Sequence, residues 1–436
     1  SINANAATRR SKVISIYGSP KYSDNFSNFA YVNPSAPQGG RITMPAYGGF
    51  DSFNPFIFKG IATPEVAALT LDSLGIIPID DEASAYPLIA KEFEIPDDHS
   101  FIGFIINEKA QFSDGSPVTV DDVIFSYNSI IEKGAPFYKV YYADIEKVEK
   151  INDYHVRFYF KPNSTNKELP LILAQLKIFS ANDWKNKDFS TPSLQPPLGS
   201  GPYILERFSP SKFLIFKKNN NYWGQNLPSR KGFFNFAEVR YDYYQDTTIT
   251  LQALFAGNID IREEYIAKNW VSGYNNDMVK SGQIIKEEIR HNQPATLQFF
   301  GFNTRLPKFA DKRVRQAISL AFNFNWANDK LFYKQYRRID SYFANTDMAA
   351  NGLPQGKELE ILNKFKTKLP QAVFTEKPSV PEHKDHLQTR DNLRQAVKLL
   401  QAAGYDFIDG KMTNLSTGKP LEIEVLSNSA NGAAFT

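Results

Sequence analysis

Alternating apolar and polar residues predict four strands, because a period of two is typical of half-buried strands. These segments are residues 40–47 (GRITMPAY), 155–162 (HVRFYFKP), 213–219 (FLIFKKN) and 238–244 (EVRYDYY). Apolar residues at helical spacing predict helices elsewhere. The helical segments are residues 63–74, 249–258, 311–323 and 389–405. Strands and helices alternate irregularly, which favours a multidomain α/β or α+β protein over a barrel or a bundle.

Three carboxylates lie close together in FSDGSPVTVDDVIFSYNSI, at Asp114, Asp121 and Asp122. Thr119 has the position of an N-cap, with the last two carboxylates in the first turn of a helix over residues 120–133. Asp114 stands in a turn sequence, where its side chain accepts from nearby backbone N–H groups. The spacing of a calcium loop is absent. The cluster therefore predicts a turn and a helix start rather than a catalytic or metal site.

Two glycines flank Ser200 in LGSGPY. We expect Gly199 and Gly201 to adopt backbone torsions that are closed to other residues, at a tight crossing between domains. No phosphate-binding glycine pattern is completed here.

The length, charge and composition of the chain narrow the classes of protein to which it can belong. The 436 residues are enough for two or three cores. The 50 basic and 47 acidic residues are interspersed, so no basic block indicates a nucleic-acid partner. Cysteine is absent, which excludes disulfides and thiolate sites and suits an oxidising compartment. No run of 18 apolar residues indicates a membrane span.

Residues with catalytic chemistry are sparse. No G-x-S-x-G run is present, and the five histidines are scattered, so no hydrolase is predicted. The segment EHKDH, residues 382–386, has ligands for a metal, but solvated charges are the more common arrangement in a Pro-flanked polar loop. We therefore predict no catalytic residue, no metal ligand and no cofactor.

Seven segments occur together in a distinctive order: FDSFNPF, FSDGSPVTVDDVIFSYN, LGSGPYILERF, NNNYWG, ALFAGNIDI, FNTRLPKFADKRVRQAISLAFN and AVKLLQAAGY. This series resembles the family 5 extracellular solute-binding proteins, which are the peptide, dipeptide and nickel receptors of bacterial ABC importers. Residues 14–40 resemble the YejA-like branch of that family more narrowly. Members of this branch resemble receptors for peptides, including antibiotic and cell-wall peptides.

The resemblance implies an α/β fold of the periplasmic binding protein type II class, with two lobes, a hinged cleft and an additional α/β domain. Lobe I would comprise residues 1–53 and 195–262, the extra domain residues 54–194, and lobe II residues 263–436. Relatives continue beyond this length. The C-terminal part of the usual fold would then be missing, or a separate C-terminal segment would complete it.

The implied function is capture of oligopeptides, possible cell-wall or antibiotic peptides among them, for delivery to inner-membrane ABC permease subunits by a monomer. Receptors for a metal chelate or haem are the alternative, and a hydrolase is less favoured. The implied location is the periplasm. Ala4-Asn5-Ala6 has the form of an export-signal cleavage site, and a cloning scar is the alternative.

Ligand contacts are carried over from the family by position, with core packing or solvation as the competing interpretation for each. The candidates are Tyr47, Gly48, Phe50, Asp51, Tyr138, Tyr141, Tyr142, Glu263, Glu264, Phe302, Asn303, Arg305 and Asn428. Glu263 and Glu264 would bind an amine, and Arg305 would clamp a carboxylate. Asn428 lies in LSNSANGAAF, which lacks the acid that holds the ligand amine in several relatives.

Overall fold

The structure is a computed structural model that describes residues 7–291 and 293–426. The chain divides into two compact units, residues 1–263 and 264–436, and each is described by itself. Lobe II was predicted to begin at residue 263, and unit 2 begins at Glu264. The division into lobe I, an extra domain and lobe II, with the bounds given above, stays a prediction.

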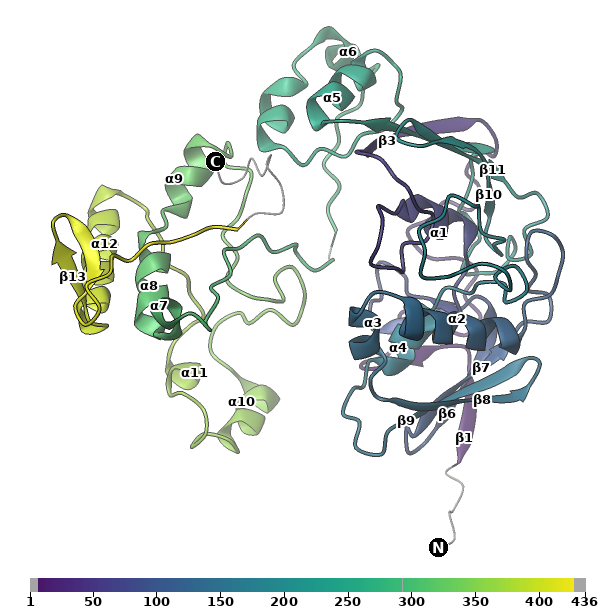
Figure 1. Ribbon diagram of the computed structural model, residues 1–436, viewed down its shortest axis with the longest axis horizontal. Coiled ribbons are helices and arrows are strands. Elements are labelled where there is room, and N and C mark those ends of the chain that lie inside the picture. The colour runs from purple at the N-terminus through teal and green to yellow at the C-terminus, as the bar shows by residue number, and fades with distance from the viewer. Residues whose placement is uncertain (1–6, 292, 427–436) are drawn as a thin grey trace, which may run out of the picture. The chain divides into compact units, whose positions relative to one another are not determined.

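Unit 1 is built mainly from antiparallel sheets (Figure 1). Its strands are β1 (Thr8–Ser11), β2 (Ile14–Ser15), β3 (Arg41–Tyr47), β4 (Gly75–Ile76), β5 (Ser84–Pro87), β6 (Ala90–Pro96), β7 (Phe101–Ile106), β8 (Ile145–Asn152), β9 (His155–Phe160), β10 (Tyr203–Ser209), β11 (Phe213–Lys218) and β12 (Glu238–Tyr244). Its helices are α1 (Pro64–Thr70), α2 (Val120–Lys133), α3 (Phe137–Tyr141), α4 (Leu169–Ala174) and α5 (Thr247–Phe255). The four predicted strands are confirmed as β3, β9, β11 and β12.

A five-stranded antiparallel sheet, in the order β1-β6-β7-β9-β8, supports the larger core of unit 1. Helix α2 packs against β8, and its Tyr127 ring meets Phe158 of β9 edge-on at 5.2 Å. Phe93 of β6 and Phe104 of β7 are fully buried in the same core. Strands β2, β5 and β4 form a small separate sheet.

The second large sheet has the order β10-β11-β12-β3, and β3 pairs with β12 in parallel while the other pairs are antiparallel. Phe50, Phe53 and Val66 cover one face of it and form a second core. The parallel pair ends at Tyr47 and Tyr244, which lie opposite each other. Two strands therefore bring their carboxyl ends to the same place.

The carboxylates at residues 114–122 form the predicted turn and helix start. The Thr119 N–H donates to Asp122 Oδ2 at 2.8 Å, and α2 begins at the next residue. Asp122 is buried, and its Oδ1 also accepts from the Ala181 N–H at 2.8 Å. Asp121 pairs with a lysine of β8, and Asp114 accepts from its own turn. The structural interpretation is confirmed, with one bond to a distant segment that spacing did not predict.

Gly199 and Gly201 are required by a close approach of two backbones. A Cβ at Gly199 would lie 1.9 Å from the carbonyl oxygen of Thr70, and one at Gly201 would lie 2.8 Å from it. The Gly201 N–H donates to that same oxygen at 2.8 Å. Neither glycine has a positive φ. The expected reason, unusual torsions, is therefore wrong, and close packing is the physical reason instead.

A buried charge cluster joins four segments of unit 1. Asp72 is fully buried, and its carboxylate accepts from Arg230 Nη2 at 2.7 Å and from the Tyr222 hydroxyl at 2.8 Å. Lys177 Nζ donates to the carbonyl oxygen of Leu71 at 2.8 Å. Burial lowers the pKa of Lys177 to about 8 and raises the pKa of Tyr222 well above its usual value. The cluster fastens the end of α1 to the rest of the unit.

Unit 2 is mostly helical in its described part. Its elements are the π-helix η1 (Asn269–Gly273), helices α6 (Asp277–Lys280), α7 (Pro307–Ala310), α8 (Lys312–Ala321), α9 (Phe324–Lys330), α10 (Gly356–Asn363), α11 (Ala372–Thr375) and α12 (His386–Ala402), and the hairpin strands β13 (Tyr405–Ile408) and β14 (Lys411–Asn414). Helices α8 and α12 pack together over Phe309, Val314 and Tyr405. Among the described residues, no helix has both the length and the apolar character to cross a bilayer. The four predicted helices are confirmed as α1, α5, α8 and α12.

Candidate functional site

The carboxyl ends of β3 and β12 present an exposed aromatic ring beside a polar group. Tyr47 is 45% exposed, and its hydroxyl lies 3.1 Å from Thr250 Oγ1 on α5. Arg262 Nε donates to the same Thr250 hydroxyl at 3.0 Å. The Gly48 N–H donates to the carbonyl oxygen of Tyr244 at 2.9 Å with a φ of +75°, a torsion that favours glycine. In open α/β sheets, ligands bind outside the carboxyl ends of parallel strands, and β3 and β12 are paired in parallel.

Thr250 and Arg262 were missed by the sequence analysis. Tyr47 and Thr250 are 203 residues apart, and no spacing rule joins a strand end to a helix at that distance. Parallel pairing of β3 with β12 is the feature that brings them together, because α5 follows β12 directly.

The loop that follows Tyr47 is closed by its own side chains. The Phe50 ring is 4% exposed and packs against Phe53 and Tyr243, with ring centres 5.7 and 5.0 Å away. Asp51 Oδ1 accepts from the Ile61 N–H at 2.6 Å, and the Asp51 N–H donates to the Ile61 carbonyl at 2.9 Å. Phe50 therefore belongs to the core, and Asp51 closes the loop. Ligand contact by either residue stays a prediction.

The three candidate tyrosines near α3 lie in different environments. Tyr142 is 7% exposed, and its ring meets Tyr127 at 5.5 Å. Tyr138 is half-buried against Phe56, with the ring centres 6.0 Å apart. Tyr141 is 53% exposed. Burial raises the pKa of Tyr138 and of Tyr142, so both rings are neutral in ordinary buffers.

Exposed apolar side chains gather near α3 in what we call the aromatic patch. The Ala135 N–H donates to the Phe56 carbonyl at 2.7 Å and holds the two contributing segments side by side. The patch consists of Phe58, Phe137, Val140 and Tyr141. Phe58 is 81% exposed, which is far more than a core-forming ring shows.

The acidic pair at the unit boundary is split between two environments. Glu263 is exposed. Glu264 is half-buried, and its carboxylate accepts from the Ile266 N–H at 2.9 Å and from the Tyr274 hydroxyl at 3.0 Å. Glu264 therefore supports the start of unit 2, and amine binding by the pair stays a prediction.

The remaining candidates of unit 2 form a turn. Phe302 packs against Phe309 with ring centres 5.3 Å apart. Asn303 Oδ1 accepts from Arg305 Nε at 3.0 Å, and both residues are exposed. In the described part of the chain, no carboxylate pairs with Arg305, so the alternative of a surface ion pair is not found. Asn428 lies outside the described residues.

The EHKDH segment is only partly solvated. Glu382 and Lys384 form an exposed ion pair at 2.7 Å, as expected for surface charges. His383 is 4% exposed, with Nδ1 3.2 Å from Thr389 Oγ1, so the solvated interpretation is wrong for this residue. Within residues 7–291 and 293–426, no group of three His, Asp or Glu side chains is arranged to hold a metal ion.

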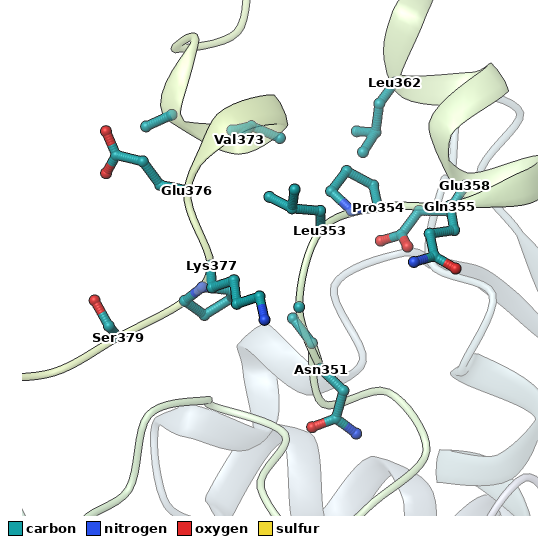
Figure 2. A pocket seen from close by; sticks show the side chains of 14 residues that line it. Asn351, Leu353, Pro354, Gln355, Glu358, Leu362, Val373, Glu376, Lys377 and Ser379 are labelled. Carbon is teal, nitrogen blue, oxygen red and sulfur yellow. The ribbon is translucent and has the colours of Figure 1, made fainter.

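An open hollow of about 680 Å³ lies in unit 2 between residues 350 and 379. Figure 2 shows Leu353, Pro354 and Leu362 near its apolar part, with the carboxylates of Glu358 and Glu376 at its margins. None of the predicted ligand-binding residues lines it.

A sequence model described as bacterial extracellular solute-binding proteins, family 5 Middle, matches residues 84–434. The chain belongs to this family. Family 5 solute-binding proteins bind small ligands and work with the permease subunits of ABC importers.

Two curated relatives of this family 5 protein cover nearly the whole chain. The protein YejA of Escherichia coli, which is described as uncharacterized, is 38% identical over 421 residues, 96% of this chain and 69% of the relative. The probable peptide-binding protein YejA of Agrobacterium fabrum is 35% identical over 428 residues, 96% of this chain and 69% of the relative. The chain spans 64 to 69% of the length of the first relatives that it matches.

Two solved structures show the fold. NikA from Brucella suis, in complex with Fe(III)-EDTA, has a TM-score of 0.64 at 17% identity and covers 88% of this chain and 68% of its own. The oligopeptide-binding protein AppA from Bacillus subtilis, in complex with a nonapeptide, has a TM-score of 0.59 at 18% identity with the same coverage. This family 5 protein therefore has the α/β fold of periplasmic binding proteins, as predicted.

Proposed function

We propose that this family 5 protein is the substrate-binding receptor of an ABC importer, that it captures peptides in the periplasm, and that it delivers them to inner-membrane permease subunits. The observation that carries the proposal is the 35% identity, over 96% of the chain, to a relative described as a probable peptide-binding protein. Another relative, also from Agrobacterium fabrum and 35% identical, is described as a peptidoglycan-binding protein. This description makes cell-wall peptides the first ligands to test.

The structure supports a peptide ligand through its chemistry. Strand β3 lies at the edge of its sheet and exposes Tyr47 at its end, and extended peptides bind through main-chain hydrogen bonds at strand edges. The aromatic patch offers apolar surface for side chains. Neither feature demands one peptide sequence, which suits a receptor for varied peptides.

A metal chelate is the second candidate. The similarity to NikA in complex with Fe(III)-EDTA, at a TM-score of 0.64, favours it. The fold alone does not separate the two ligands, because the structure of AppA with a nonapeptide has a comparable TM-score.

One experiment distinguishes these ligands. The purified chain is titrated in parallel with a mixture of short peptides, a murein tripeptide, Fe(III)-EDTA and haem, and its melting temperature is measured, since any ligand that binds the native state raises it. We expect the peptides to raise the melting temperature and the chelate and haem to leave it unchanged. A shift with Fe(III)-EDTA or haem and none with peptides would refute peptide capture.

A matched pair of variants tests the strand-end site. Tyr47→Ala should weaken peptide binding by about tenfold, as expected for loss of an aromatic anchor. Tyr17→Ala is the control, because Tyr17 is similarly exposed, at 57%, on another segment of unit 1. Equal affinities for both variants and the unaltered chain, measured by calorimetry, would remove Tyr47 from the site.

A further inference from the structure

Arg338 of unit 2 has an unusual environment for a cation. Its guanidinium carbon lies over the rings of Phe322 and Phe324, 5.3 and 5.6 Å from their centres. The side chain is half-buried, and its Nε is fully shielded from solvent. Among the described residues, this Nε has no hydrogen-bond partner and no carboxylate pairs with Arg338. Burial lowers the pKa of Arg338, because charge is disfavoured where water is excluded and no anion replaces it.

The neighbouring residues show that an anion is available but is directed elsewhere. Arg337 is 81% exposed at its side chain and lies 4.0 Å from Asp340. The Asp340 carboxylate therefore faces the exposed Arg337, where an ion pair contributes little to stability. The shielded Arg338 has no carboxylate partner among the described residues. A half-buried guanidinium without an anionic partner is costly, so its retention needs an explanation.

The position of Arg338 is fixed by the surrounding chain. Asn328 of α9 accepts from the Tyr336 N–H at 3.1 Å, and its side-chain amide donates to the Tyr336 carbonyl at 2.7 Å. These two bonds fasten the backbone two residues before Arg338. The rings beneath the guanidinium come from the junction of α8 and α9, since Phe322 follows the end of α8 and Phe324 begins α9. The guanidinium is therefore oriented before any partner arrives.

We propose that Arg338 binds a carboxylate group of the captured ligand, an inference that rests on the proposed receptor function. A planar guanidinium stacked on aromatic rings keeps its outer N–H groups free, and these match the two oxygens of a carboxylate. A peptide carries this group at its C-terminus and on Asp or Glu side chains. Arg338 then sets a preference for peptides that bear a carboxylate.

Three hexapeptide pools built from Ala, Gly, Ser, Lys and Phe separate the two sources of carboxylate. The first pool has free C-termini, the second is C-terminally amidated, and the third is amidated with one Glu per peptide. Dissociation constants are measured by calorimetry at low ionic strength. We expect the unaltered chain to bind the first or the third pool about tenfold more tightly than the second, as a charge-assisted bidentate pair predicts.

The variants assign this preference to one residue. Arg338→Met should bind the three pools with equal affinity, and Arg337→Met, which removes the exposed neighbouring charge, should keep the preference. Equal binding of all pools by the unaltered chain would overturn the inference without needing any variant. A uniform loss for Arg338→Met together with a lower melting temperature would also overturn it, by showing a purely structural role. If no pool binds the unaltered chain, the peptide-receptor function fails, and the carboxylate role fails with it.

Discussion

Replacement of Lys177 by methionine should change how the stability of unit 1 depends on pH. The Lys177 ammonium donates to the carbonyl oxygen of Leu71 and lies close to the buried pair of Asp72 and Arg230. Burial is the main reason for its low pKa, and the Arg230 charge adds to it, while Asp72 opposes both. Methionine has a similar shape and no charge, so Lys177→Met removes the titration with little change in packing.

The magnitude follows from the difference between the folded and unfolded pKa values. The folded protein holds this proton less tightly, with a pKa of about 8 against the usual 10.5. Folding therefore releases a proton between these values, and the free energy of unfolding rises with pH across that window. At about 1.4 kcal/mol per pKa unit, the protonated Lys177 destabilises the folded state by about 3 kcal/mol at pH 7 and by about 1 kcal/mol at pH 9.5. The values at the two pH differ by about 2 kcal/mol. Because the Lys177 side chain is half-buried rather than fully buried, we expect a measured difference of about 1 kcal/mol between pH 7 and pH 9.5.

Urea denaturation followed by tryptophan fluorescence measures this change in unit 1. The chain has four tryptophans, and replacing Trp270 and Trp326 by phenylalanine leaves Trp184 and Trp223 as reporters of unit 1. The unaltered chain should gain about 1 kcal/mol relative to Lys177→Met between pH 7 and pH 9.5. The hydrogen bond to the Leu71 carbonyl is charge-assisted only while Lys177 is protonated, so the change in its strength between the two pH values is already part of the pKa shift.

The control is Lys109→Met, which removes an exposed lysine from the same unit and should leave the pH dependence unchanged. If the unaltered chain and Lys177→Met gain stability in parallel between pH 7 and pH 9.5, the Lys177 proton is not coupled to folding and the argument from burial is refuted.

Four further substitutions test contacts that hold unit 1 together, each by urea denaturation. Asp122→Asn should lower the free energy of unfolding by about 1 to 2 kcal/mol. Asp121→Asn, which alters an exposed ion pair, should lower it by less than about 0.5 kcal/mol. Equal losses for the two variants would contradict the buried role of Asp122. Gly199→Ala should cost about 3 kcal/mol or more, since its Cβ would clash with the Thr70 carbonyl, and unchanged stability would disprove that close approach. Tyr222→Phe should cost about 1 to 3 kcal/mol by leaving a buried carboxylate short of a partner; no loss would show that the bond is unimportant.

Local sequence signals predicted the helices best where both ends are set locally. Helix α2 begins and ends at the predicted residues, because Thr119 caps its start and Gly134 follows its last turn. Helix α1 ends at Thr70, four residues earlier than the predicted end at residue 74. The reason is tertiary: the following residues leave the helix to place Asp72 against Arg230, which lies 158 residues away. No local pattern contains that information.

The same limit applies to the candidate site. Tyr47 ends strand β3 and Phe50 lies in the loop that follows it. Both side chains are aromatic, and the sequence offers no means of telling which ring faces the core. The structure places Phe50 at 4% and Tyr47 at 45% exposure, because Phe53 and Tyr243 enclose the former. Family position indicated the segment correctly as a loop after a strand, whereas the direction of each side chain depended on partners distant in sequence.

Two arginines show what packing adds to a prediction made from residue chemistry. Arg305 was chosen from the sequence because of its family position, yet it is exposed and bonded to Asn303 two residues before it. Arg338 has the same side chain and lies in no motif of the sequence, but it is half-buried over two rings. A solvated guanidinium gains little when it exchanges water for a carboxylate, whereas a shielded one without a partner gains more. Burial without a partner, which only the folded chain reveals, therefore makes Arg338 the stronger candidate to select a ligand by its charge.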